Sequence, residues 1–234
     1  MSEANFTFLT GSLGSASVDR GVTGGQTPPN GGGTFVYGFN SLQVSTGAVA
    51  LFNNQVNFAP MAKGGSVQVA MKKLPSGGTS GWSCFCYIGL QGTNVNDTAY
   101  ILGIQDGDPA FISLRKGRIV DGLPEGGVDP TGSKILRRST NSVALDTWIQ
   151  LRLDMVVNLT GDVVLNMFQN DVAVNPVLSP VWSSIVGMSS FIDDSLSINT
   201  GTAPLTSGRA GFGQVSSDIT RRSIFDAYGI SRQL

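Results

Sequence analysis

The sequence contains no histidine among its 234 residues. Histidine is the commonest general base and metal ligand, so Ser-His-Asp triads, Cys-His pairs and histidine-bound zinc cannot be built from this chain. A glycoside hydrolase could still work with two carboxylates. The only two glutamates are Glu3, near the terminus, and Glu125, in a Gly-rich loop, so neither is expected on an alternating strand, where a rigid catalytic pair is usually held. We therefore predict that the protein is not an enzyme.

Cys84 and Cys86 are the only cysteines. Their i, i+2 spacing on a strand places both side chains on one face, about 7 Å apart, and a disulfide between them would need distorted geometry. We therefore expect two buried, reduced thiols. Because the chain has no histidine to complete a site, zinc is not expected.

Oxygen ligands for calcium occur in two short stretches, Asp193-Asp194 and Asp106-Gly107-Asp108. Calcium binds several such ligands in a flexible loop, but Asp also favours turns through its own side-chain hydrogen bonds. We interpret both stretches as turns, with a calcium site as the alternative. No Gly-rich segment is followed by the Lys-Ser/Thr pair of a phosphate loop. We predict no metal and no cofactor.

The chain carries little charge: 13% of its residues are charged, and the net charge is −1. Nucleic acid is not an expected partner, because binding its backbone requires clustered Lys and Arg. Low net charge also weakens self-repulsion, so association with other subunits and a homo-oligomer are expected. The pairs Arg137-Arg138 and Arg221-Arg222 are typical of solvated turns or salt-bridge partners. The second pair is also a candidate contact, because Arg is enriched at interfaces.

The elements that would position these residues are strands, because apolar residues recur with period two. The clearest strand runs from Trp148 to Asn158, with Val163 to Gln169 returning as a hairpin. Ser66 to Leu74 alternates in the same way. Further strands are predicted at Thr34–Phe39, Ala48–Asn53, Trp82–Leu90, Tyr100–Ile104, Ala110–Leu114, Arg209–Val215 and Ser223–Ile230.

About a dozen strands at such short spacing predict an all-β, two-sheet antiparallel sandwich. We divide the chain into an N-terminal arm with a Gly-rich loop, residues 1–33, and a single sandwich domain, residues 34–234. The domain contains a long loop at 175–207. Loops of this length are usually functional or carry structure of their own.

Trp182 and Phe191 supply apolar surface to this long loop. They could cover one end of the sandwich, or they could anchor a partner, as aromatic residues do at interfaces. The predicted partner contacts are Phe6, Phe8, Trp182, Phe191, Arg221 and Arg222.

Three stretches resemble the concanavalin A-like jelly roll. Asp146-Thr147-Trp148-Ile149-Gln150-Leu151-Arg152-Leu153-Asp154 resembles its W-x-x-L-x-L strand. Gly208-Arg209-Ala210-Gly211-Phe212-Gly213 with Ile224–Ile230 is similar to its terminal pairing, and Tyr100–Ile104 with Leu114–Gly117 to its central hairpin. The resemblance implies the jelly-roll fold. The resemblance implies neither catalytic nor metal-binding residues, because the glucanase strand Glu-x-Asp-x-x-Glu and the metal ligands of legume-type lectins have no counterpart in this sequence.

The overall composition of the chain is similar to that of tailed-bacteriophage virion proteins, which are leaderless, low in charge and rich in Gly, Ser, Thr and Asn.

Three functions remain open. The first is a structural component of a viral particle, such as a capsid decoration, tail, collar or baseplate subunit that binds neighbouring virion proteins and its own copies. The second is a glycan-binding module with Tyr228, Trp82 or Trp182 as its aromatic platform, and the third a glycoside hydrolase. Since Met1–Asn5 lacks the features of a secretory signal, we expect synthesis in the host cytoplasm, location in the virion and no membrane partner.

Overall fold

The computed structural model describes part of the chain, in the ranges 3–6, 16–17, 34–38, 41–45, 50–54, 63–73, 82–92, 97–105, 107, 109–123, 135–170, 181–194, 203–216 and 222–232. Side chains are described from residue 63 onward, except at 82, 120, 216, 222, 224, 226–228, 230 and 232. Among these residues no helix has the length and hydropathy needed to cross a lipid bilayer.

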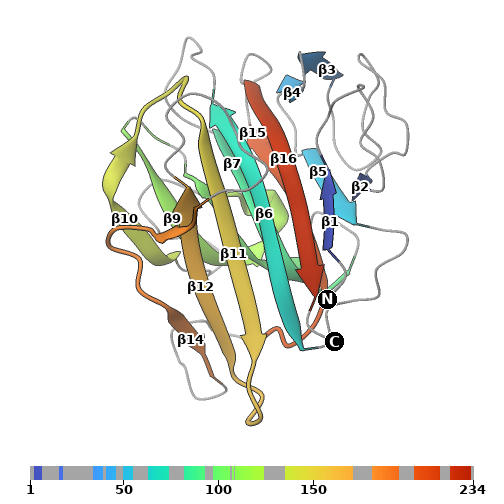
Figure 1. The fold of residues 1–234 in the computed structure, drawn as a ribbon, viewed down its shortest axis with the longest axis vertical. Coiled ribbons are helices and arrows are strands. Elements are labelled where there is room, and N and C mark those ends of the chain that lie inside the picture. Colours follow the sequence, from blue (N-terminus) through green and yellow to red (C-terminus); the bar gives the residue numbers. More distant parts are fainter. Residues whose placement is uncertain are drawn as a thin grey trace.

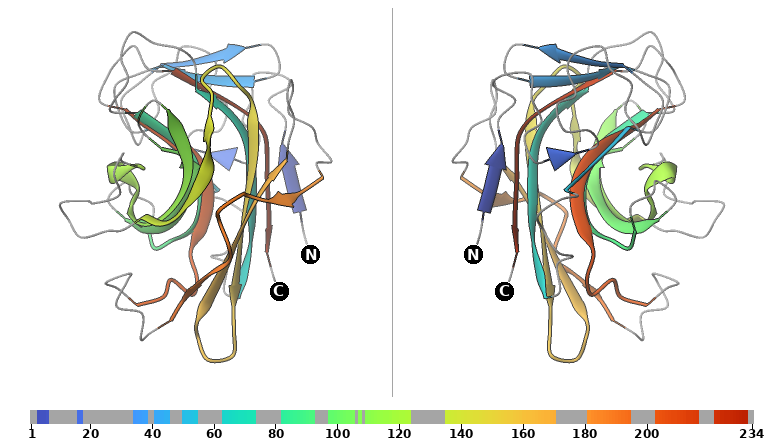
Figure 2. Two further views of the ribbon diagram at one scale, coloured as in Figure 1. Left: turned by 90° about the vertical axis from the view of Figure 1, so that its left-hand side faces the viewer. Right: turned by 90° about the vertical axis from the view of Figure 1, so that its right-hand side faces the viewer.

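The described strands form two antiparallel sheets that face each other as a sandwich (Figure 1, Figure 2). The larger sheet has nine strands in the order β13-β12-β11-β6-β16-β4-β3, with β1 beside β16 and β14 beside β12. Their bounds are β1 Glu3–Phe6, β3 Thr34–Gly38, β4 Ser41–Ser45, β6 Gly64–Lys73, β11 Ile149–Val157, β12 Val163–Asn170, β13 Ser183–Ser184, β14 Phe191–Asp193 and β16 Arg222–Arg232.

The smaller sheet has seven strands in the order β10-β9-β8-β7-β15-β5-β2. Their bounds are β2 Ala16–Ser17, β5 Ala50–Asn54, β7 Trp82–Leu90, β8 Thr98–Ile104, β9 Ala110–Arg118, β10 Ile135–Val143 and β15 Arg209–Ser216. A short 3-10 helix, η1, follows β9 at Ile119–Asp121. The run β7-β8-β9-β10 is a meander, because each strand pairs with its neighbour in sequence.

The predicted two-sheet sandwich is confirmed, as is the hairpin of β11 and β12. The structure also reveals elements that alternation did not predict. Strand β10 is one of them, and β13 and β14 lie inside the predicted loop 175–207, where they pair with β12. Within the predicted arm 1–33, β1 pairs with β16 and β2 with β5. The boundary at residue 33 stays a prediction.

Burial follows the period-two pattern on both sheets. Between the sheets lies the main core, in which Leu151 and Leu153 of β11 face Cys86 of β7 and Leu102 of β8, all fully buried. Alternate residues of β11 point the other way, so Arg152 and Asp154 lie on the outer face of the nine-stranded sheet.

The outer face of the seven-stranded sheet carries a second apolar cluster. Phe85, Tyr87 and Ile101 alternate with the main-core residues of β7 and β8 and are fully buried against Ile119 and Leu123. Figure 2 shows η1 on this outer side. Arg115 of β9 is also fully buried here, and its guanidinium donates to the Gly122 carbonyl oxygen at 2.6 Å. Along β7 to β9 this sheet face is therefore closed by the chain itself.

Candidate functional site

The chain crosses from the seven-stranded to the nine-stranded sheet between β10 and β11. The turn of this crossover contains Asp146, a non-glycine residue with a φ of 57°. Its amide donates to the Lys73 carbonyl oxygen at 2.7 Å, and its carboxylate lies 2.9 Å from the Lys72 ammonium. The crossover is thus fixed to the end of β6, and it forms one wall of an opening at the edge of the sandwich.

A bulge in β10 shapes the opposite wall. Arg138 pairs with Ser113 and Ser142 with Phe111, so three residues of β10 face the single residue Ile112 of β9. The hydroxyl of Ser139 takes the place of a backbone partner at the bulge. It accepts a hydrogen bond from the Ile112 amide at 3.0 Å and donates one to the Asn141 carbonyl oxygen at 2.7 Å. Bulges re-aim side chains in this way, often next to functional sites.

The turn Ile185–Met188 closes the third side and bridges the two sheets. The Ile185 amide donates to Met167 of β12 at 3.5 Å, and the Thr140 amide, freed by the bulge, donates to the Val186 carbonyl oxygen at 3.0 Å. Gly187 allows this approach. Its φ is 86°, and a Cβ there would lie 2.8 Å from the Thr140 nitrogen.

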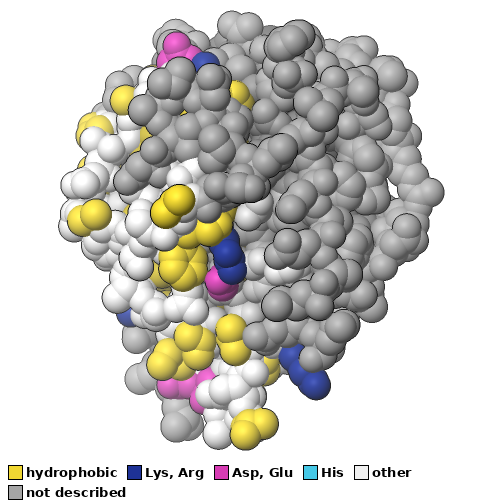
Figure 3. All heavy atoms as spheres, in the orientation of Figure 1, with side chains coloured by type: hydrophobic (Ala, Val, Ile, Leu, Met, Phe, Trp, Pro, Cys, Tyr) yellow, Lys and Arg dark blue, Asp and Glu magenta, His cyan; other side chains and the backbone are white. Residues whose placement is uncertain are grey.

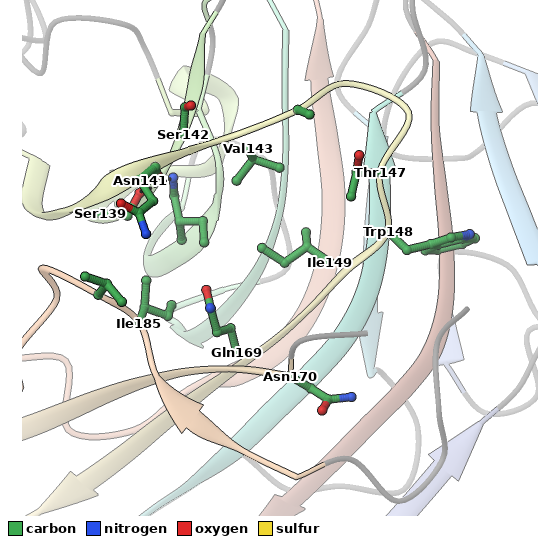
Figure 4. Close-up of a pocket in the computed structure, with 13 residues that line it drawn as sticks. Ser139, Asn141, Ser142, Val143, Thr147, Trp148, Ile149, Gln169, Asn170 and Ile185 are labelled. Atoms are coloured by element: carbon green, nitrogen blue, oxygen red, sulfur yellow. Dashed lines mark hydrogen bonds between the residues drawn. The ribbon is translucent and has the colours of Figure 1, made fainter. Parts of the chain in front are cut away.

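These three walls enclose a cavity of about 330 Å³, which we call the edge pocket (Figure 4). In the figure Val143, Ile149 and Gln169 converge on the cavity, whereas Trp148 and Asn170 point to the other side of their strands. The lining residues are Ile112, Ser139, Asn141, Ser142, Val143, Ala144, Thr147, Trp148, Ile149, Gln169, Asn170, Ile185 and Val186.

The described lining of the edge pocket contains no charged side chain. Ile112 and Ile185 form an apolar floor and are 2% and 3% exposed. The Asn141 amide and the Ser142 hydroxyl lie at the exposed rim, and neither makes a side-chain hydrogen bond within the part of the chain that the structure describes. The pocket thus offers an apolar surface beside neutral donors and acceptors, which suits a neutral ligand with hydroxyl groups.

A buried polar cluster lies at another end of the sandwich. The Lys116 ammonium is 2.6 Å from the Asp193 carboxylate, and both side chains are at most 1% exposed. The Tyr100 hydroxyl donates to the same carboxylate and accepts from the Leu205 amide at 3.0 Å. Burial, together with the hydrogen bond to Asp193, raises the pKa of Tyr100, so its hydroxyl stays protonated at neutral pH. This cluster holds β14, Ala203 and Leu205 on the sandwich and offers no ionised tyrosine as a base.

The predicted partner contacts differ in their surroundings. Phe191 is 7% exposed and belongs to the main core, where it covers the end of the sandwich, so it presents little surface to a partner. Trp182 is partly exposed beside the Arg152 guanidinium, which lies 6.0 Å from its ring centroid. Phe6 and Arg222 lie in β1 and β16 with undescribed side chains, and Phe8 and Arg221 lie outside the described residues.

The residues considered for metal binding are engaged elsewhere or not described. Asp193 accepts from Lys116 and Tyr100, while Asp106 and Asp108 lie outside the described residues. No group of three or more Cys, Asp or Glu side chains that could hold a metal ion occurs in the described ranges. Cys84 and Cys86 are buried and free, as predicted.

Comparison with known proteins gives matches in structure alone. No family model matches the chain, and no curated protein matches its sequence. Among solved structures, the alginate lyase Aly36B has a TM-score of 0.53 and 12% identity, covering 100% of this chain and 97% of its own. The metal-free carbohydrate recognition domain of Emp46p has a TM-score of 0.54 and 8% identity, covering 98% and 97%. The fold is a concanavalin A-like sandwich.

This concanavalin A-like sandwich is also similar to the exoplasmic/lumenal domain of VIP36 in its Ca²⁺/Man3GlcNAc-bound form, with a TM-score of 0.50 and 10% identity over 89% of this chain and 86% of that one. At such identities the likeness shows the fold and nothing finer. The motifs quoted from the sequence therefore indicated the correct fold.

Sequence reasoning did not find the edge pocket. Its walls come from β10, the crossover at 144–148 and the 185–188 turn, which alternation cannot bring together. One signal was present: the polar run Ser139-Thr140-Asn141-Ser142 breaks the alternation of apolar residues, as a bulged edge strand does.

Proposed function

We propose that this concanavalin A-like sandwich is a non-catalytic carbohydrate-binding protein, and that its edge pocket binds a neutral sugar. The observation that carries this proposal is the lining: an apolar floor of Ile112, Ile149 and Ile185 beside the neutral amide and hydroxyl groups of Asn141 and Ser142. A sugar ring presents apolar C–H groups on its faces and hydroxyl groups at its edge, so it matches both halves of such a lining.

The absence of charge in the described lining favours a neutral ligand over an acidic one. A uronate or phosphate group placed there would lose its hydration without meeting a Lys or Arg side chain, which is costly. The described lining also holds no group that could transfer a proton at neutral pH. These features support binding without bond cleavage.

The structural neighbours add support by analogy. A carbohydrate recognition domain and a domain bound to Man3GlcNAc share this fold, although a fold alone does not carry a function.

The test is calorimetric titration of the purified chain with a panel of neutral oligosaccharides, with alginate oligomers as the charged comparison. Ser142→Trp places a large ring at the exposed rim and is expected to weaken binding at least about tenfold. Thr206→Trp, at another exposed position, is the control and should leave affinity unchanged. Binding of no neutral glycan, or equal binding by the Ser142→Trp variant, would contradict the proposal.

A second candidate is a structural subunit of a bacteriophage particle that binds copies of itself and neighbouring virion proteins. One observation favours it: Leu159 is 107% exposed at the tip of the β11–β12 hairpin, which extends beyond one end of the sandwich (Figure 2). An apolar side chain that projects from the tip of a hairpin can insert into a pocket of a neighbouring subunit. Mass spectrometry and cryo-electron microscopy of purified particles test this function. If the chain is such a subunit, it should occupy a repeated position in the particle. Deletion of residues 1–15 should abolish incorporation while the sandwich still folds.

A further inference from the structure

The outer face of the nine-stranded sheet carries a compact group of aromatic and charged side chains, which we call the outer patch. It consists of Arg152 and Asp154 on β11, Phe168 on β12 and Trp182 next to β13. The Arg152 guanidinium lies 5.8 Å from the Phe168 ring centroid and 6.0 Å from that of Trp182. Figure 3 views this face and shows basic and acidic side chains among apolar ones near its middle.

Within the outer patch, Arg152 is already oriented. Its Nε and Nη2 atoms donate to the two carboxylate oxygens of Asp154 at 2.6 and 2.9 Å. Two aromatic rings hold the guanidinium further, so little side-chain entropy remains to be lost on binding. Arg152 and Asp154 are still 33% and 20% exposed, so both can be reached by a partner.

Apolar side chains extend the outer patch. Val164 of β12 pairs with Ile192 of β14, so both lie on the same outer face, and Ile192 is 55% exposed. Val181, next to Trp182, is 84% exposed. Aromatic and Arg side chains surrounded by apolar surface are the composition of interface centres. The opposite sheet offers no comparable surface along β7 to β9, because the second cluster closes it.

The charges of the outer patch favour one particular partner. Arg152 and Asp154 are two residues apart on one strand and have opposite charge. A two-fold axis that runs across the strands at the level of Leu153 reverses the strand direction and places each Arg152 opposite Asp154 of the second copy. A surface that matches itself in this way forms an isologous contact.

We propose that the outer patch is the interface of a symmetric dimer, in which two copies of this chain pack the outer faces of their nine-stranded sheets together. Each Arg152–Asp154 pair then faces the reversed pair of the second copy, while Trp182 and Phe168 pack beside them. This dimer is independent of sugar binding, since the edge pocket opens between the sheets.

Charge exchange tests the dimer with size-exclusion chromatography and light scattering. The wild-type chain is expected to be a dimer at about 100 μM, where even a weak contact is populated. Arg152→Asp and Asp154→Arg each create like charges across the axis, so each variant alone should be a monomer. An equimolar mixture of the two variants should restore dimers, because an acidic patch then meets a basic one. The double variant carrying both changes should also dimerise.

Arg118→Asp is the matched control. It changes the net charge by the same amount as Arg152→Asp but lies on the seven-stranded sheet, so the dimer should persist. Thermal unfolding of every variant separates loss of the interface from loss of the fold. A wild-type chain that is a monomer overturns the proposal, even if that monomer binds an oligosaccharide through Trp182. Folded single variants that remain dimers, or a mixture that stays monomeric, overturn it as well.

Discussion

The Lys116 ammonium and the Asp193 carboxylate lie 2.6 Å apart in the interior of the sandwich, and both are shielded from solvent. The pair joins β9 of one sheet to β14 of the other. Lys116 also donates to the Ala203 carbonyl oxygen at 2.7 Å, so the same ammonium holds the chain beyond β14.

Replacing one member of this pair should be costly. Lys116→Met leaves the Asp193 charge buried without its ion-pair partner, and the free energy of unfolding should fall by about 3–5 kcal/mol. Urea denaturation followed by tryptophan fluorescence measures the loss. Arg118→Met is the control, because Arg118 is 43% exposed in its pair with Asp121 and should contribute less than about 1 kcal/mol. Equal losses in the two variants would mean that burial does not strengthen the Lys116–Asp193 pair.

Alkaline pH should destabilise the protein through Cys84. Burial raises the pKa of this thiol from 9.0 to about 11, although Lys73 partly opposes the shift. The unfolded chain therefore releases the thiol proton above pH 9, while the folded chain keeps it until about pH 11. A raised folded pKa gives stability that is complete below pH 9 and is lost as the pH rises toward 11.

The measurement is the urea midpoint as a function of pH. For Cys84 the loss across this window should amount to about 2–3 kcal/mol. A Cys84→Ala variant removes this contribution, so its stability should change less with pH than that of the wild type. Identical pH profiles for the two proteins would contradict the assignment to Cys84. Neither thiol should react with a maleimide at neutral pH until the chain unfolds, because both are fully buried.

Gly187→Ala should open the edge pocket at its turn. The new Cβ would lie 2.7 Å from Thr140 Cγ2, so the turn must move away from β10 and lose the bond between Thr140 and Val186. We expect a loss of about 1–3 kcal/mol and faster hydrogen exchange of the Thr140 amide. Gly161→Ala is the control: its φ is 90°, but no atom outside residues 160–162 lies within 4 Å of the added Cβ. Exchange at Thr140 that is unchanged by Gly187→Ala would contradict the role of the turn.

The pKa values of two aspartates in the β11–β12 hairpin should be shifted in opposite directions from the ordinary value. Burial raises the pKa of Asp154, although the bidentate contact with Arg152 partly opposes this shift. Hydrogen bonds from Thr160 and Asn158 lower the pKa of Asp162. The Asp162 contribution to stability is therefore present above pH 3.8 and is lost as the pH falls. The Asp154 contribution is present below pH 3.8 and is lost as the pH rises through its folded pKa.

Carbon-detected NMR titration of the two carboxyl groups checks these directions in a single sample. Arg152→Ala should raise the pKa of Asp154 further and leave that of Asp162 unchanged, because Asp162 is held by its own turn. A shift of both pKa values in one direction would show that a general charge effect, and not the local contacts, governs them.

The sequence by itself determined the fold class and excluded the kinds of catalysis that need histidine. Alternation along Ser66–Leu74 and Trp148–Asn158 predicted which face of each strand is buried, because side-chain direction in a strand depends only on residue parity. The absence of histidine removed whole catalytic classes, since composition does not depend on folding. The burial of Cys84 and Cys86 followed from the same parity.

Only the tertiary structure decided where the sites lie. The edge pocket joins residue 112 of β9 to residues 139–149 and 185–186, and the bulge of β10 that shapes it has no alternating signal. The pairing of Lys116 with Asp193 spans 77 positions, and Phe191 is buried because β14 docks on β12. Such contacts depend on strand order and register between distant segments, and local residue patterns do not encode these in any single stretch.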